Sequence, residues 1–135
     1  MAGTPRITVG GVLIQNHKIL LGKRRPDRLY PDIWDIFGGH VEPYETFEEA
    51  LIRELEEELG VMVAGTKFIA SYQDRDPTFG YDYLHHIYLI ISWKGEPYNK
   101  NPMEHEDIGW FSRAECAHLK MHGAVQNIVM EKVDF

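Results

Sequence analysis

The chain has 135 residues, of which 44% are hydrophobic and 26% charged, and its formal net charge is −7 at pH 7. This length fits a single domain over residues 1–135, and this composition is not that of a disordered chain. The acidic balance speaks against a protein that coats DNA or RNA, because it provides no net basic surface for a phosphate polymer.

Sequence features of secretion or membrane insertion are missing. The N-terminal segment Met1–Arg6 lacks the basic and apolar parts of a signal peptide, and every apolar run is shorter than the roughly 20 residues that span a bilayer. The only cysteine, Cys116, cannot form an internal disulfide. We therefore expect a cytoplasmic protein, monomeric or homodimeric, without a membrane segment.

The first third of the chain is expected to contain strands and one basic loop. Residues 7–14 and 18–21 are rich in aliphatic residues and predict two strands, and the turn residues 15–17 between them predict a hairpin. Segment 22–32 gathers basic residues between prolines and is expected to be a loop. A short apolar segment, 33–37, follows it.

The clearest helix begins after Thr46. Thr46 and Glu49 have the spacing of a capping box, and Gly60 is a typical residue to end a helix. The apolar residues at helical spacing between these ends are Phe47, Ala50, Leu51, Leu55 and Leu59. They predict a helix with one buried face.

The remaining chain predicts further strands and two helices. Residues 61–72 and 83–93 predict strands, residues 108–111 form a short apolar piece, Ser112 can cap a short helix, and residues 123–133 suggest a final helix. This order predicts an α/β fold in which helices pack against both faces of a mixed sheet.

The helix after Thr46 carries a glutamate cluster with a chemical consequence. Glu54, Glu57 and Glu58 stand at i, i+3 and i+4, which places their Cβ atoms about 5–6 Å apart on one face. Like charges this close repel, so at least one carboxyl should hold its proton tightly unless a cation is bound. Hard oxygen ligands suit Mg²⁺ or Mn²⁺. A glutamate-rich helix can equally be a solvated acidic surface.

A longer pattern decides between these two readings. Five residues separate its first two positions and seven separate the second from the third. Its positions are Gly39, Glu45, Arg53, Glu54, Leu55, Glu57, Glu58, Gly60 and Val61. This pattern resembles the Nudix box, residues 39–61, with every specified position filled.

The resemblance implies a fold and a reaction. The implied fold is the Nudix α/β/α sandwich, with a central mixed β-sheet and a loop–helix–loop catalytic motif. The implied activity is divalent-metal-dependent hydrolysis of a phosphoanhydride in a nucleoside diphosphate linked to a further group, with water attacking phosphorus. The substrate would be small and nucleotide-like, for example a nucleoside triphosphate or an oxidised nucleotide. The cofactor would be Mg²⁺ or Mn²⁺.

The resemblance also assigns roles to the residues of the box. Glu54, Glu57 and Glu58 are expected to hold the metal together with the backbone carbonyl of Gly39. Arg53 is expected to hold the glutamate side chains by salt bridges. We assign the role of catalytic base to Glu57, as a hypothesis, because a carboxylate near the attacking water can take its proton.

Outside the box, the sequence offers less specific candidates for substrate binding and for an additional acidic residue. Lys23, Arg24 and Arg25 follow the second predicted strand and could bind a phosphate, and Arg25 is the first choice because arginine offers a bidentate fork. These residues could equally be solvated loop charges. Glu104 and Glu106 lie in a segment from which some Nudix proteins supply an additional acidic ligand or base.

Two other functions stay open at this point. The first is an enzyme like isopentenyl diphosphate isomerase, which shares the fold, although no cysteine is evident in an active loop. The second is a nucleotide-sensing module without catalysis, although such modules usually have damaged box glutamates and this box is intact.

Overall fold

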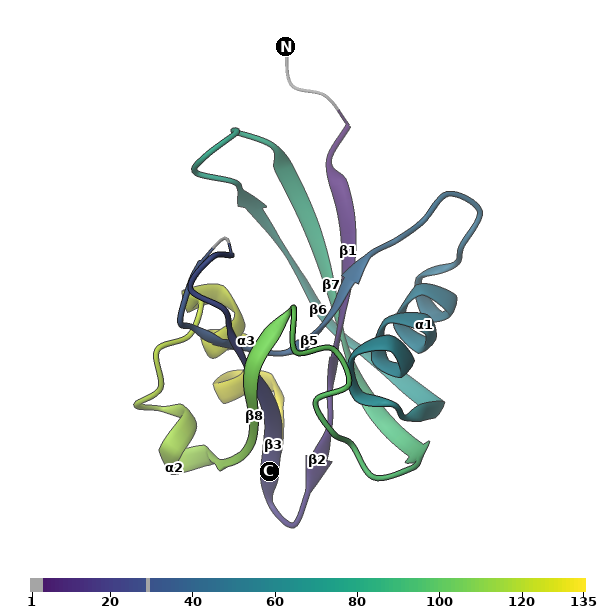
Figure 1. Ribbon diagram of the computed structural model, residues 1–135, viewed down its shortest axis with the longest axis vertical. Coiled ribbons are helices and arrows are strands. Elements are labelled where there is room, and N and C mark those ends of the chain that lie inside the picture. The colour runs from purple at the N-terminus through teal and green to yellow at the C-terminus, as the bar shows by residue number, and fades with distance from the viewer. Residues whose placement is uncertain (1–3, 29) are drawn as a thin grey trace.

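The computed structural model describes residues 4–28 and 30–135 (Figure 1). Its elements, in chain order, are β1 (Arg6–Val12), β2 (Ile14–Gln15), β3 (Lys18–Arg24), β4 (Trp34–Asp35), β5 (Phe37–His40), α1 (Phe47–Leu59), β6 (Met62–Arg75), β7 (Asp82–Lys94), β8 (His105–Ser112), α2 (Arg113–Cys116) and α3 (Gly123–Lys132). Every predicted helix is present, and the predicted strands appear with shifted ends.

The central sheet is mixed. Its strand order is β5–β1–β7–β6; β1 runs parallel to β7, and the other neighbouring strands are antiparallel. Around β3 a second sheet forms, in which β2, β4 and β8 each pair with β3 in antiparallel orientation. The prediction of a mixed sheet is confirmed.

The predicted hairpin needs a correction at Leu13. The strand expected over 7–14 is divided there, because β1 pairs within the central sheet while β2 pairs with β3 in the second sheet. Leu13 is fully buried, and its carbonyl accepts a hydrogen bond from the Leu20 amide at 3.0 Å. The chain therefore changes sheets at a core residue. The tight turn follows at Asn16 and His17, which both have positive φ.

Helices cover both faces of the central sheet (Figure 1). On one face α1 packs against β1, β5 and β6, and the buried residues there include Leu55 and Tyr88. On the other face α3 packs against β6, and a second cluster includes Ile87 and Val129. This is the expected α/β/α arrangement. Among the described helices, none has the length and apolar character needed to cross a membrane.

Local signals fix the position of α1. Thr46 and Glu49 form both bonds of the capping box, and Gly60 adopts the left-handed conformation, with φ of 68°, that ends the helix. Leu51, Leu55 and Leu59 are fully buried. Burying each leucine side chain contributes roughly 1.5–3 kcal/mol. The apolar stripe therefore holds α1 on the sheet with its glutamate face turned toward β5.

Candidate active site

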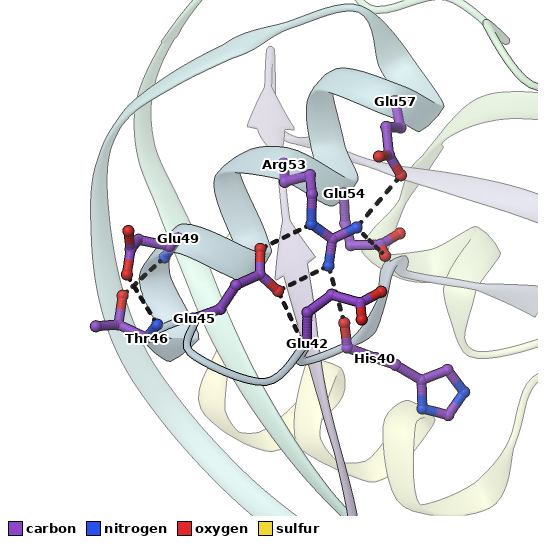
Figure 2. Close-up of polar contacts among 8 residues, drawn as sticks. All are labelled: His40, Glu42, Glu45, Thr46, Glu49, Arg53, Glu54 and Glu57. Atoms are coloured by element: carbon purple, nitrogen blue, oxygen red, sulfur yellow. Dashed lines mark hydrogen bonds and ion pairs between the residues drawn. The ribbon is translucent and has the colours of Figure 1, made fainter.

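Arg53 connects the loop before α1 to the glutamates of the helix (Figure 2). Its guanidinium donates to both carboxylate oxygens of Glu45, at 2.7 and 2.9 Å, and to the His40 carbonyl at 3.0 Å. It also donates to Glu54 at 2.9 Å and to Glu57 at 3.4 Å. The bonds from Arg53 to Glu45 lower the pKa of Glu45 to about 2. One planar fork of donors thus orients two candidate ligands and the loop together.

Two glycines bring β5 close to the glutamate face of α1. The Gly38 amide donates to the Glu58 carboxylate at 2.9 Å. A Cβ atom added at Gly39 would lie 2.5 Å from the carboxyl carbon of Glu54 and 2.6 Å from both of its oxygens. Only glycine therefore leaves the Glu54 carboxylate in its present place.

The glutamates of this face differ in their surroundings. Burial raises the pKa of Glu58 well above its ordinary value, and the neighbouring Glu54 carboxylate raises it further. Burial also raises the pKa of Glu54, although Arg53 opposes the shift. Glu58 is only 6% exposed, whereas the Glu57 side chain is 52% exposed. Burial is therefore the main reason that Glu58 holds its proton tightly, and crowding by Glu54 adds to it.

A cavity of about 610 Å³ lies beside the glutamate face. Such a volume falls in the range of roughly 300–1,000 Å³ that is typical of small-molecule sites. The carboxylates of one lining set come from the loop after β5, from α1 and from the segment before β8: Glu42, Glu54, Glu57, Glu58 and Glu104. Aromatic and imidazole rings also line the cavity, and the ring set discussed below is Tyr30, Tyr72, Tyr83, His85 and His122.

The ring set includes a stack on the central sheet. The His85 and Tyr72 rings are stacked with centroids 4.5 Å apart, and the Tyr83 ring is nearly parallel to His85 at 5.6 Å. Burial lowers the pKa of His85 to about 4, and the ring is hydrogen-bonded to Thr8. His85 is therefore neutral near pH 7.

His122 lines the same cavity, and its two ring nitrogens have different partners. The Ala124 amide donates to His122 Nδ1 at 3.2 Å, so the proton of the neutral ring belongs on Nε2. Nε2 lies 3.3 Å from Asp74 Oδ2, which also accepts the Tyr30 hydroxyl at 3.2 Å. The shared carboxylate oxygen thus ties the β3–β4 loop to β6 and to the start of α3.

The predicted phosphate contacts differ in their position relative to the cavity. Arg24 lines it, as does Arg28, which was not a candidate, whereas Lys23, Arg25 and Glu106 are not among the described residues that line it. Lys23 is paired with Glu106 at 3.1 Å. The predicted strand ended at Leu21, whereas β3 continues to Arg24, with an irregular register between Lys23 and Arg24.

The comparison with protein families is decisive. The family model described as the NUDIX domain matches residues 4–132. The chain belongs to the Nudix family. Its structure resembles that of a MutT Nudix hydrolase from Burkholderia pseudomallei with a TM-score of 0.87 and 29% sequence identity, covering 97% of this chain and 99% of that chain. The predicted Nudix fold is thereby confirmed.

Curated relatives of this Nudix protein are hydrolases. The CTP pyrophosphohydrolase of Escherichia coli K12 is 32% identical over 108 residues, which are 80% of this chain and 76% of the relative. The nucleoside triphosphatase NudI of Klebsiella pneumoniae strain 342 is 33% identical over 132 residues, which are 89% of this chain and 92% of the relative. The protein is therefore a MutT-like Nudix hydrolase.

The box glutamates of this Nudix hydrolase share one wall but do not form a finished metal site. Over residues 4–28 and 30–135, no three acidic, histidine or cysteine side chains are grouped closely enough to hold an ion. Arg53 instead engages Glu54 and Glu57. The donor chemistry nevertheless fits a hard cation, because Glu58 is buried beside another carboxyl and Gly39 leaves space against Glu54.

Sequence reasoning missed other groups that line the cavity. Asp35 lies in β4, where burial raises its pKa, and it accepts the Ile36 amide at 2.8 Å. His105 begins β8, is 5% exposed, and packs against the Phe37 ring with centroids 4.9 Å apart. A lone aspartate inside the apolar segment 33–37 was the available signal for the first. We find no comparable signal for the second.

Proposed function

We propose that this Nudix hydrolase cleaves a phosphoanhydride bond of a small nucleotide, with a nucleoside triphosphate as the first candidate. One observation carries the proposal: a carboxylate wall on α1 and a wall of flat rings line the same cavity. The first wall suits cation-assisted chemistry on phosphate, and the second suits stacking of a nucleobase. The names of the E. coli and Klebsiella relatives point to the same substrate class.

The candidate metal ligands are Glu54, Glu57 and Glu58, together with the backbone carbonyl of Gly39. Bound Mg²⁺ or Mn²⁺ would make a water more acidic and neutralise charge on the phosphate oxygens. Because Arg53 now holds Glu54 and Glu57, these carboxylates must change partners, at least in part, when they bind a cation.

We assign proton transfer to Glu57. It lines the cavity, and its side chain is 52% exposed, so a water molecule can reach its carboxylate. Glu58 is buried and already accepts the Gly38 amide, which suits a fixed ligand better than a mobile base. Arg53 would act as a positioning residue, because its bonds set the direction of the glutamate side chains.

The ring wall supports a nucleobase site. His85 and Tyr72 stack on each other and line the cavity, and a base that stacks on an aromatic ring there would gain about 1–3 kcal/mol. The polar groups beside them, at Asp35 and Tyr30, could select among bases by hydrogen bonding.

The two alternative functions, an isomerase-like enzyme and a sensing module without catalysis, have less support than hydrolysis. Cys116 is fully buried in the core beneath α3 and is not among the described residues that line the cavity, so it does not supply the thiol of an isomerase-like site. A sensing module without catalysis would not require an intact set of box glutamates beside the cavity.

The test is a hydrolysis screen in Mg²⁺ over nucleoside triphosphates, oxidised triphosphates, nucleotide sugars, dinucleotides and ADP-ribose. Glu57→Gln should lower kcat by about two orders of magnitude or more, the usual worth of a general base. Metal affinity should be mostly retained, because Glu54 and Glu58 would be the principal ligands. Glu58→Gln should also abolish turnover. Glu56→Gln is the matched control, because Glu56 sits on the same helix, pairs with Lys100, and does not line the cavity.

Three outcomes of this screen are informative. Metal-dependent turnover that is lost in the two site variants and kept in the Glu56 variant supports the proposal and names the substrate. Near-normal turnover of the Glu57 variant removes this residue from the role of base. Lack of turnover on every member of the panel refutes nucleotide hydrolysis.

A further inference from the structure

We propose that Arg28 is a substrate-binding residue that contacts the phosphate chain, and that Glu104 holds its guanidinium at the cavity rim until substrate arrives. This inference rests on the proposed function, because it assumes a substrate with phosphate groups. It concerns a side chain outside the Nudix box, on the β3–β4 loop.

The charge of the cavity creates the need for such a residue. Carboxylates of Glu54, Glu57 and Glu58 line the wall where a phosphate chain would lie in the proposed reaction. Among the described lining residues, the permanently charged cations are Arg24 and Arg28. Arg24 already lies 4.0 Å from the carboxylate of Asp35, on the neighbouring strand β4.

The contacts of Arg28 make it suitable for exchange. Its guanidinium donates to the Met103 carbonyl at 3.1 Å and lies 3.5 Å from a Glu104 carboxylate oxygen. Both side chains of this ion pair are 40% exposed, so solvent screens the attraction and the pair is weak. A phosphate group offers the same guanidinium a bidentate, doubly charged partner.

Arg53 provides the contrast within the same site. Its donors are already used by Glu45, Glu54, Glu57 and the His40 carbonyl, and its partners organise the loop. Moving Arg53 to a phosphate would undo that organisation, whereas moving Arg28 breaks a single exposed ion pair and one carbonyl bond.

The loop that carries Arg28 is anchored on both sides. At its base Arg24 exchanges backbone bonds with Asp32 and Ile33, at 3.2 and 2.8 Å. At its far side the Tyr30 hydroxyl donates to Asp74. The backbone of the loop is therefore positioned independently of the Arg28 side chain, so a change at Arg28 should leave the loop in place.

The experiment compares Arg28→Ala and Arg28→Lys with wild-type enzyme, using the substrate found in the hydrolysis screen. Arg28→Ala should raise KM at least tenfold and change kcat less than threefold. Arg28→Lys should recover part of this loss, because lysine keeps the charge but not the fork. The inhibition constant of the matching free nucleoside, which has no phosphate, should stay within twofold of wild type in both variants.

A control and a rival variant sharpen the result. Arg75→Ala removes another exposed arginine, which is paired with Asp82 at 2.9 Å and is not among the described residues that line the cavity, and it should leave KM unchanged. Arg25→Ala tests the residue favoured by the sequence. A KM increase in Arg25→Ala without one in Arg28→Ala would overturn the assignment.

Two further results would also overturn it. The first is an unchanged KM in Arg28→Ala. The second is a parallel loss of nucleoside binding, which would show that Arg28 merely supports the loop. If the wild-type enzyme hydrolyses no nucleotide, the proposed function fails and this inference fails with it. If the wild-type enzyme does hydrolyse a nucleotide but one of the contrary results above is found, only this inference fails.

Discussion

Gly39→Ala is the sharpest test of how β5 positions the glutamates. The added methyl group would lie 2.5 Å from the Glu54 carboxyl carbon, and ordinary contact begins at 3.4 Å, so the carboxyl must retreat by about 0.9 Å. Gly39 is not among the residues with positive φ, so alanine itself fits the backbone. The strain therefore falls on Glu54 and on its 2.9 Å bond to Arg53.

The expected effect is large on activity and small on stability. A misplacement of about 1 Å in a catalytic group can cost about 100-fold in rate, so kcat/KM should fall by about two orders of magnitude, or about 2.7 kcal/mol. Replacing glycine by alanine stabilises a protein by about 0.4–1 kcal/mol through the unfolded chain, which offsets part of the local strain. The hydrolysis rate and the urea midpoint measure these two effects separately.

A double-mutant cycle isolates the contact. In a Glu54→Ala background the methyl group meets no carboxylate, so Gly39→Ala should there become stabilising by about 0.4–1 kcal/mol. Gly123→Ala is the control, because a Cβ at Gly123 meets nothing within 4 Å. Wild-type kcat/KM in Gly39→Ala would refute the idea that this glycine positions Glu54.

Two further predictions concern stability. Thr46→Ala removes the capping box of α1 and should lower the free energy of unfolding by about 1 kcal/mol in urea titration; an unchanged midpoint would show that the cap contributes nothing. His85 has a pKa lowered from 6.5 to about 4, so below pH 6.5 the unfolded chain takes up a proton that the folded chain does not. Stability should therefore fall as pH drops from 6.5 to 4, and His85→Gln should reduce that fall; equal pH dependence in variant and wild type would contradict the assignment.

The sequence was most informative where the signals are local. The capping box at Thr46, the leucine stripe and Gly60 lie within a few helical turns of one another, and they placed α1 with correct ends. The strands expected over 61–72 and 83–93 are present as β6 and β7, extended by a few residues. Each prediction used interactions between near neighbours in the chain.

Strand pairing was beyond such reasoning. The parallel pairing of β1 with β7 joins segments some 75 residues apart, as in the Thr8–His85 register, and nothing near Thr8 specifies that partner. The division of the predicted strand at Leu13 likewise depends on contacts with segments that are distant in the chain. Its burial depends on both sheets being present, so an unbroken aliphatic run gave no warning of it.

The same distinction separates the two walls of the cavity. The carboxylates of the cavity come mainly from the box, where one helix and the strand before it supply the geometry, so Glu54, Glu57 and Glu58 could be named from the sequence. The ring wall joins Tyr30 of the β3–β4 loop, Tyr72 of β6, His85 of β7 and His122 beside α3. Tyrosines such as Tyr72 can be proposed from the sequence as base-stacking rings, but which rings meet is settled only when the sheets form. Under the proposed function, the groups for the reaction lie in one continuous segment, whereas the groups for the choice of substrate come from several distant elements.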